Sequence, residues 1–181
     1  MHLLSATPGT ISNGDEAIDL DQPPGDIVIL TVADSELACF AKAAAMLPAG
    51  APSVRLANLL QLRHPYSIDL YVEKVIAHAR FVCVILLGGK SYWSYGIDEI
   101  AESARKHGTA FAAIADGREP DPALDRASNV TVEARERLRE YLRQGGAANA
   151  LSFLKTASRL IGADLGIPDD PVPVADAGLY L

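Results

Sequence analysis

The stretch Phe81–Leu87 reads FVCVILL, an uninterrupted apolar run rich in β-branched residues. The stretch Ile27–Ala33, which reads IVILTVA, is nearly as apolar. Strands that helices cover on both faces of a parallel sheet have such sequences, whereas strands with one solvated face alternate apolar and polar residues. Working outward from these runs, we predict five strands: His2–Ala6, Asp26–Val32, Ser53–Asn58, Phe81–Leu87 and Thr109–Ala115.

Helical patterns lie between the predicted strands. Asp34 and Ser67 are each predicted to cap a helix whose apolar residues recur at helical spacing. A third helix is predicted after Tyr95-Gly96, with acidic residues early, basic residues late and Gly108 at its C′ position. The alternation of strands and helices indicates an α/β fold of the flavodoxin or Rossmann kind, with a mostly parallel sheet of four or five strands flanked by helices.

The pattern changes after the last predicted strand. Two helices, Val132–Gln144 and Ala147–Ile161, are predicted without a strand between them, and Gly145-Gly146 separates them into a helical hairpin. The stretch after the hairpin is rich in proline, which is typical of a linker. The expected organisation is an α/β domain, a helical hairpin that packs on it or forms a neck, and a linker into a downstream region: residues 1–122, 123–165 and 166–181.

Composition and charge exclude several classes of partner. The net charge is −7 and no cluster of Lys and Arg is present, which argues against binding to nucleic acid. The longest apolar runs are too short to span a bilayer, and the first residues lack the features of a signal peptide. We therefore expect a cytoplasmic protein that contacts neither nucleic acid nor membrane.

Catalytic and cofactor motifs are not found. The loop Gly88–Ser91, GGKS, resembles the end of a phosphate-binding loop, but Val84 stands where that motif needs its first glycine. The histidines do not pair with one another or with a cysteine at metal-ligand spacing, and His64, in a loop before Pro65, is interpreted as a capping or packing residue more readily than as a ligand. We expect no catalytic residue, no metal site and no cofactor in this segment.

The loop Gly88–Gly96 is the strongest candidate for a functional surface. It leaves the most apolar strand at its carboxyl end, where α/β domains bind ligands, and it contains Tyr92, Trp93 and Tyr95. One interpretation is that all three aromatic side chains pack against their own domain, as a plug at the start of the next helix. The other is that at least one is exposed here and contacts another part of a larger protein or a bound ligand. The residues predicted to share this edge are Asn58, Gln61, His64, Gly88, Gly89, Tyr92, Trp93 and Tyr95.

Several strings in the sequence, in this order and spacing, resemble one family. They are Leu56–Pro65 (LANLLQLRHP), Ser67–Lys74 (SIDLYVEK) and Leu86–Gly96 (LLGGKSYWSYG), together with the opening Met1–Leu4 and the turn Pro8–Thr10. Over essentially the whole chain, the sequence resembles the N-terminal portion of the large, CobN-type subunit of aerobic cobaltochelatase, which is related to the large subunit of magnesium chelatase. The strings are family markers and include no catalytic signature.

The resemblance implies an activity for a larger assembly. Cobaltochelatases of this kind insert cobalt into hydrogenobyrinic acid a,c-diamide, a tetrapyrrole, during aerobic cobalamin (vitamin B12) biosynthesis, using ATP and magnesium. The expected partners are the remainder of the large subunit and two smaller subunits, one of them an AAA+ ATPase. The family's large subunit is several times longer, so we expect its catalytic residues beyond Leu181 and an inactive structural or interaction domain here. The alternative is a free-standing flavodoxin-like binding or receiver module.

Overall fold

The computed structural model describes residues 16–116 and 120–173. Its centre is one parallel sheet in the order β2-β1-β3-β4, which confirms the predicted α/β class. The predicted strand His2–Ala6 and the turn Pro8–Thr10 lie outside the described residues. The four strands are β1 (Ile27–Thr31), β2 (Val54–Asn58), β3 (Phe81–Leu86) and β4 (Ala110–Ala115).

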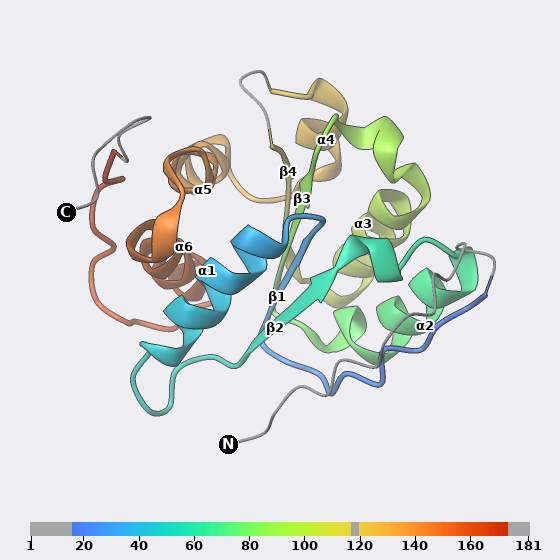
Figure 1. The fold of residues 1–181 in the computed structure, drawn as a ribbon, viewed down its shortest axis with the longest axis horizontal. Coiled ribbons are helices and arrows are strands. Elements are labelled where there is room, and N and C mark those ends of the chain that lie inside the picture. The colour runs from blue at the N-terminus through green and yellow to red at the C-terminus, as the bar shows by residue number, and fades with distance from the viewer. Residues whose placement is uncertain (1–15, 117–119, 174–181) are drawn as a thin grey trace.

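Helices cover both faces of this sheet, as Figure 1 shows with the sheet nearly edge-on. One face carries α1, α5 and α6, and the other carries α2, α3 and α4. Their bounds are α1 (Asp34–Ala45), α2 (Pro65–Lys74), α3 (Ser94–His107), α4 (Pro122–Ala127), α5 (Val132–Gln144) and α6 (Gly146–Leu160). Three short 3-10 helices complete the set: η1 (Leu59–Gln61), η2 (Ile76–His78) and η3 (Lys90–Tyr92).

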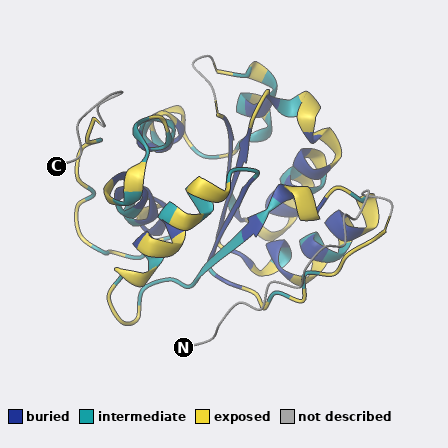
Figure 2. Ribbon diagram, in the orientation of Figure 1, coloured by how far each residue is buried: buried dark blue, intermediate teal, exposed yellow. Residues whose placement is uncertain are grey.

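The central strands are buried on both sides, as their apolar sequences predict (Figure 2). Alternate residues of β1 and β3 enter two separate cores. Val28 and Val84 pack toward α2 and α3, whereas Ile29 and Cys83 pack toward α1 and α6. The hairpin of α5 and α6 supplies Phe153 to the second core, where its ring meets the ring of Phe40 edge-on at a centroid distance of 5.0 Å.

Two of the predicted helix caps are wrong. Helix α2 begins at Pro65, and its cap is His64, whose Nδ1 accepts a hydrogen bond from the Tyr66 amide at 3.1 Å. Ser67 is instead a buried residue within α2, and its hydroxyl accepts a hydrogen bond from the Ile18 amide. Asp34 is the first residue of α1 and bonds to Asn58, and the capping position belongs to Ala33.

Other boundaries agree closely. Helix α3 ends at Gly108 in the left-handed conformation, with φ at +72°, as predicted for a C′ glycine. Helix α5 has the predicted bounds, and the α5–α6 break falls at Gly145. Helix α4 was not predicted, because its first residue, Pro122, closes a polar stretch that reads as a turn.

The proline-rich stretch after α6 follows the surface of the hairpin. The Tyr141 hydroxyl donates to the Asp169 carbonyl at 2.6 Å, and the Asn149 side chain bonds to both backbone groups of Val172. Up to Pro173, this stretch is therefore held against α5 and α6. Among the described residues, no helix is long and apolar enough to cross a membrane.

Candidate contact surface at the carboxyl edge of the sheet

The strand order reverses between β1 and β3, the two central strands of the sheet. From β1 the chain crosses to β2 on one side, and from β3 it crosses to β4 on the other. Loops that leave β1 and β3 therefore diverge, and ligands of open α/β sheets bind beside such a point. The residues of the predicted site lie at the end of β2, in the segments after β2 and β3, and in the first turn of α3.

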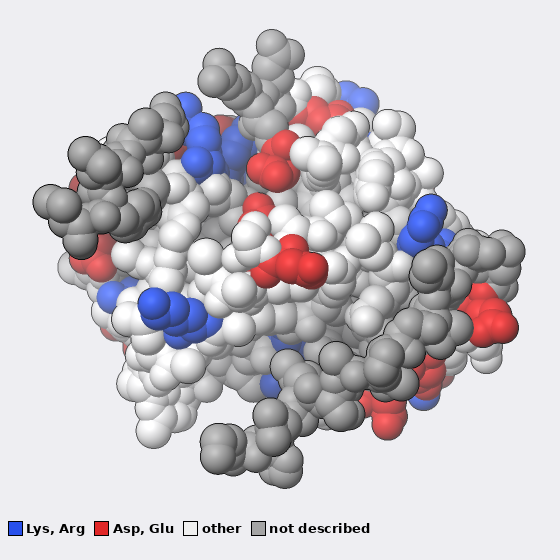
Figure 3. Space-filling view, viewed as in Figure 1, with Lys and Arg blue, Asp and Glu red and all other residues white. Residues whose placement is uncertain are grey.

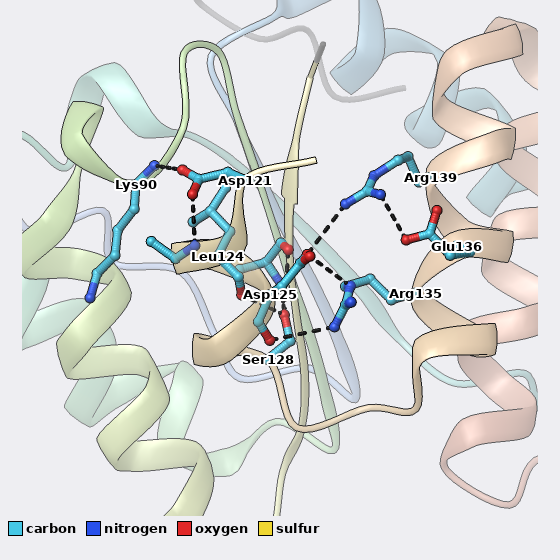
Figure 4. Close-up of polar contacts among 10 residues, drawn as sticks. Lys90, Asp121, Leu124, Asp125, Ser128, Arg135, Glu136 and Arg139 are labelled. Atoms are coloured by element: carbon cyan, nitrogen blue, oxygen red, sulfur yellow. Dashed lines mark hydrogen bonds and ion pairs between the residues drawn. The ribbon is translucent and has the colours of Figure 1, made fainter. Parts of the chain in front are cut away.

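The loop after β3 is fixed by an acidic residue that follows β4 and caps α4. Gly88 and Gly89 have φ of +85° and +84°, a conformation that favours glycine. The Lys90 amide donates to Asp121 Oδ2 at 2.7 Å, and a Cβ on Gly89 would overlap that carboxylate (Figure 4). Hydrogen bonds from the amides of Lys90 and Ala123 lower the pKa of Asp121. The Lys90 amide, which a phosphate group would need, is thus bonded to a carboxylate.

Trp93 is buried within its own domain. Its side chain belongs to the core under α2 and α3, and the residue is 8% exposed. Its indole Nε1 donates to the Leu62 carbonyl at 2.8 Å. Gly96, one turn later, lies so close that a Cβ there would overlap the indole ring. For Trp93 the structure therefore favours the helix-entry plug over the exposed contact.

The two neighbouring tyrosines are exposed. Tyr92 is 51% exposed and Tyr95 is 42% exposed. The Tyr95 hydroxyl donates to Asp69 Oδ1 of α2 at 2.6 Å, and this bond to a carboxylate raises the pKa of Tyr95 to about 12. The expectation of at least one exposed aromatic in this loop therefore holds for these two residues.

The residues predicted after β2 have mainly structural contacts. Asn58 accepts a hydrogen bond from the Leu60 amide and donates to Asp34 Oδ1 at 2.8 Å, which ties the ends of β1 and β2 together. His64 caps α2, and Gln61 is exposed in η1. The Trp93–Leu62 bond joins this segment to the loop after β3, so the structure brings the predicted residues to one edge.

Three exposed apolar residues on this edge were missed by sequence reasoning. Leu60 and Tyr66 follow β2, Leu87 follows β3, and each is more than half exposed. The signal that was available is their position, since each lies between the carboxyl end of a strand and the first turn of the next α-helix. We define the edge patch as the five exposed apolar side chains of this edge: Leu60, Tyr66, Leu87, Tyr92 and Tyr95. Separated exposed apolar residues are ordinary, but a group at one edge is typical of a contact surface.

A charged network between α4 and α5 was also missed. Two nearly buried guanidinium groups of α5 share one carboxylate of α4 (Figure 4). Asp125 Oδ1 lies 3.1 Å from Arg135 Nε and 3.4 Å from an Arg139 nitrogen, and Arg139 also pairs with Glu136 at 2.7 Å. The network joins α4 to α5 across the edge of β4. Within residues 16–116 and 120–173, no group of His, Cys, Asp or Glu has the arrangement of a metal site.

The fold defines the class: a doubly wound parallel α/β domain with exposed apolar side chains at the carboxyl edge of its sheet. Sequence comparison gives the relatives. The chain is 41% identical over 99% of its length to aerobic cobaltochelatase subunit CobN of Sinorhizobium sp., and 43% identical over 91% of its length to that subunit in Pseudomonas aeruginosa. It is therefore a homologue of a segment of CobN, and the predicted resemblance is confirmed.

The relatives are much longer than this chain. The chain spans 14% of the Sinorhizobium protein and 13% of the Pseudomonas protein. A solved structure, the catalytic subunit of cobaltochelatase from Mycobacterium tuberculosis, matches 84% of this chain with a TM-score of 0.66 and 22% identity, over 12% of its own length. That match supports the fold. No protein-family model matches the sequence.

Proposed function

We propose that this chain is the N-terminal domain of the tetrapyrrole-binding large subunit of an ATP-dependent cobaltochelatase. The complete enzyme would insert cobalt into hydrogenobyrinic acid a,c-diamide, and this domain would serve as a structural and interaction unit. The observation that carries the proposal is an identity of 41–43% to two CobN subunits over at least 91% of the chain. Such similarity over nearly the whole chain argues for the same place in a similar subunit.

The edge patch is proposed to contact the remainder of that large subunit. Most of each relative's length lies outside the matched segment, so a large surface is available to cover it. Tyrosine side chains bury much apolar area and are enriched among the residues that contribute most to interfaces. Cobalt and the tetrapyrrole, as substrates, together with ATP, magnesium and the two smaller subunits, would then be handled by other parts of the assembly.

The test uses the full-length large subunit that contains this segment. Tyr92→Ala combined with Leu87→Ala should reduce cobalt insertion by the reconstituted enzyme at least fivefold and make the subunit more sensitive to limited proteolysis. The matched control is Met46→Ala combined with Val132→Ala, because these residues are equally exposed but lie at the opposite edge of the sheet. Equal effects of the two double variants would overturn the assignment of the edge patch.

A second experiment addresses the 181-residue chain by itself. Calorimetry at micromolar protein should detect neither stoichiometric Co²⁺ binding nor ATP binding or hydrolysis. The Lys90 amide of the GGKS string is bonded to Asp121, and no group of metal-ligating side chains is found in the described residues. A stoichiometric Co²⁺ or ATP signal would contradict the proposed role as a structural and interaction unit without an active site.

A further inference from the structure

A pocket opens on the other side of the switch point from the edge patch. It lies between the first turns of α1 and the connection of α5 to α6, and its volume is about 180 Å³. The aromatic rings of Phe40 and Phe153 form part of its wall, and Gly146 lies at its rim, while Ser35 and Glu36 supply polar groups. An apolar cavity of about 150 Å³ admits benzene, so this pocket has room for a ligand of about six heavy atoms.

The carboxyl group of Glu36 is the chemically unusual feature of this pocket. One of its oxygens accepts a hydrogen bond from the buried Thr31 hydroxyl. Within the described part of the chain, no Lys or Arg forms an ion pair with it. Burial raises the pKa of Glu36, the Asp116 carboxylate adds to this effect, and the bond from Thr31 opposes it. Glu36 therefore brings to the pocket an acidic group that the described residues pair with a hydroxyl and not with a cation.

The surroundings agree with this local charge. On the face that Figure 3 shows, acidic side chains gather near the centre, over the start of α1, among mostly uncharged residues. A carboxylate against apolar walls is costly unless a cation or hydrogen-bond donors compensate it. A metal ion is a poor candidate, because no group of metal-ligating side chains occurs among residues 16–116 and 120–173. An organic cation with an apolar stem would satisfy both the carboxylate and the aromatic walls.

We propose that this pocket binds a small aliphatic amine in its ammonium form. The ammonium group would pair with Glu36 and donate to the Ser35 hydroxyl, and the alkyl stem would pack against Phe40 and Phe153. Charge-assisted hydrogen bonds to a partly desolvated carboxylate would set the preference for a cation. The apolar wall would set the preference for a stem of about four carbons over a bare ammonium ion. This inference does not rest on the proposed cobaltochelatase role.

The test titrates n-butylammonium chloride into the ¹⁵N-labelled 181-residue chain at pH 7.5 and follows the amide resonances. Saturable shifts should be confined to α1 and the α5–α6 connection, with a Kd on the order of 1 mM for so small a ligand. n-Butanol has the same stem without the charge, and ammonium chloride has the charge without the stem. Both should bind at least tenfold more weakly.

Two variants complete the design. Glu36→Gln should weaken n-butylammonium binding at least tenfold, whereas Glu73→Gln, an exposed carboxylate change on the other face of the sheet, should leave it unchanged. Ala150→Leu, which fills the pocket from α6, should abolish binding and keeps the test valid if the Glu36 variant does not fold. Equal binding of n-butanol and n-butylammonium, shifts spread over the whole surface, or undiminished binding by the Ala150 variant would overturn the proposal.

Discussion

The indole Nε1 of Trp93 donates a hydrogen bond to the backbone carbonyl of Leu62 at 2.8 Å. This bond joins the loop after β3 to the segment after β2. It also satisfies the polar atom of a side chain that is otherwise surrounded by core residues. Trp93 thus packs in the core, while its neighbours Tyr92 and Tyr95 are exposed and belong to the edge patch.

Replacing Trp93 by alanine should destabilise the chain strongly. The change removes a large buried ring and leaves the Leu62 carbonyl without its partner, so the free energy of unfolding should fall by about 3–5 kcal/mol. Urea unfolding followed by circular dichroism measures it. The control is Tyr92→Ala, which alters an exposed ring and should change stability by less than about 0.5 kcal/mol. Similar values for both variants would contradict the buried position of Trp93.

Gly96→Ala tests the close packing of Gly96 against Trp93, because the sign of the change in unfolding free energy depends on that packing. In an exposed helix this exchange stabilises by up to about 1 kcal/mol, because alanine is the better helix former. Here the new methyl group overlaps the Trp93 ring, so we expect a loss of about 1–3 kcal/mol and a red shift of the tryptophan fluorescence. Ser94→Ala, an exposed change in the same helix, serves as the control. A stabilised Gly96 variant would show that the ring moves freely.

Asp125→Ala should separate α4 from α5. The side chains of Arg135 and Arg139 are 9% and 11% exposed, and the change deprives both guanidinium groups of a carboxylate. Arg139 keeps its pairing with Glu136, but Arg135 is left without a carboxylate, which should cost about 3–5 kcal/mol in thermal or urea unfolding. The comparison is Glu136→Ala, whose carboxylate is half exposed and should cost less than about 1 kcal/mol. Equal costs would mean that solvent already screens the shared carboxylate.

The pKa of Tyr95 should fall when its partner is neutralised. The hydrogen bond to the Asp69 carboxylate raises the pKa of Tyr95 to about 12, against about 10 for a free tyrosine. The stabilisation linked to this bond is fully present below about pH 10 and is lost as the pH rises through about 12. Carbon-13 NMR of the tyrosine ring should therefore show a lower pKa in Asp69→Asn than in the parent chain. Glu73→Gln should not change it, and an unchanged value in Asp69→Asn would reject the bond as the cause.

Much of the fold could be predicted because its signals are local. The apolar runs of β1 and β3 identify a sheet that is covered on both faces, and Gly108 marks the end of α3 by its required conformation. The start of α2 was predicted wrongly because Ser67 and His64 are both able to cap, and the choice depends on the burial of Ser67 against Ile18. No local pattern contains that contact.

The site was predictable in position but not in orientation. The strand-end rule places Tyr92, Trp93 and Tyr95 at the carboxyl edge, and the structure has them there. Which ring turns inward depends on η3 and on the distant Leu62 carbonyl. The network of Asp125 with Arg135 and Arg139 was not predictable, because these residues look like ordinary surface charges until α4 and α5 are packed together.

The all-parallel sheet has a consequence for how the chain reaches this structure. The nearest strand partner of Ile27 along the chain is Val54, its partner on the other side is Phe81, and β4 joins only through β3. Among these strands, no pair is closed by a tight turn, so each pairing requires an intervening helix to be brought back across the sheet. Such non-local topologies fold more slowly than helical bundles or hairpins of similar size. Because β1 pairs with both β2 and β3, its docking is the step on which the rest of the sheet depends, and a chain that stalls before it would present two apolar strands to its neighbours.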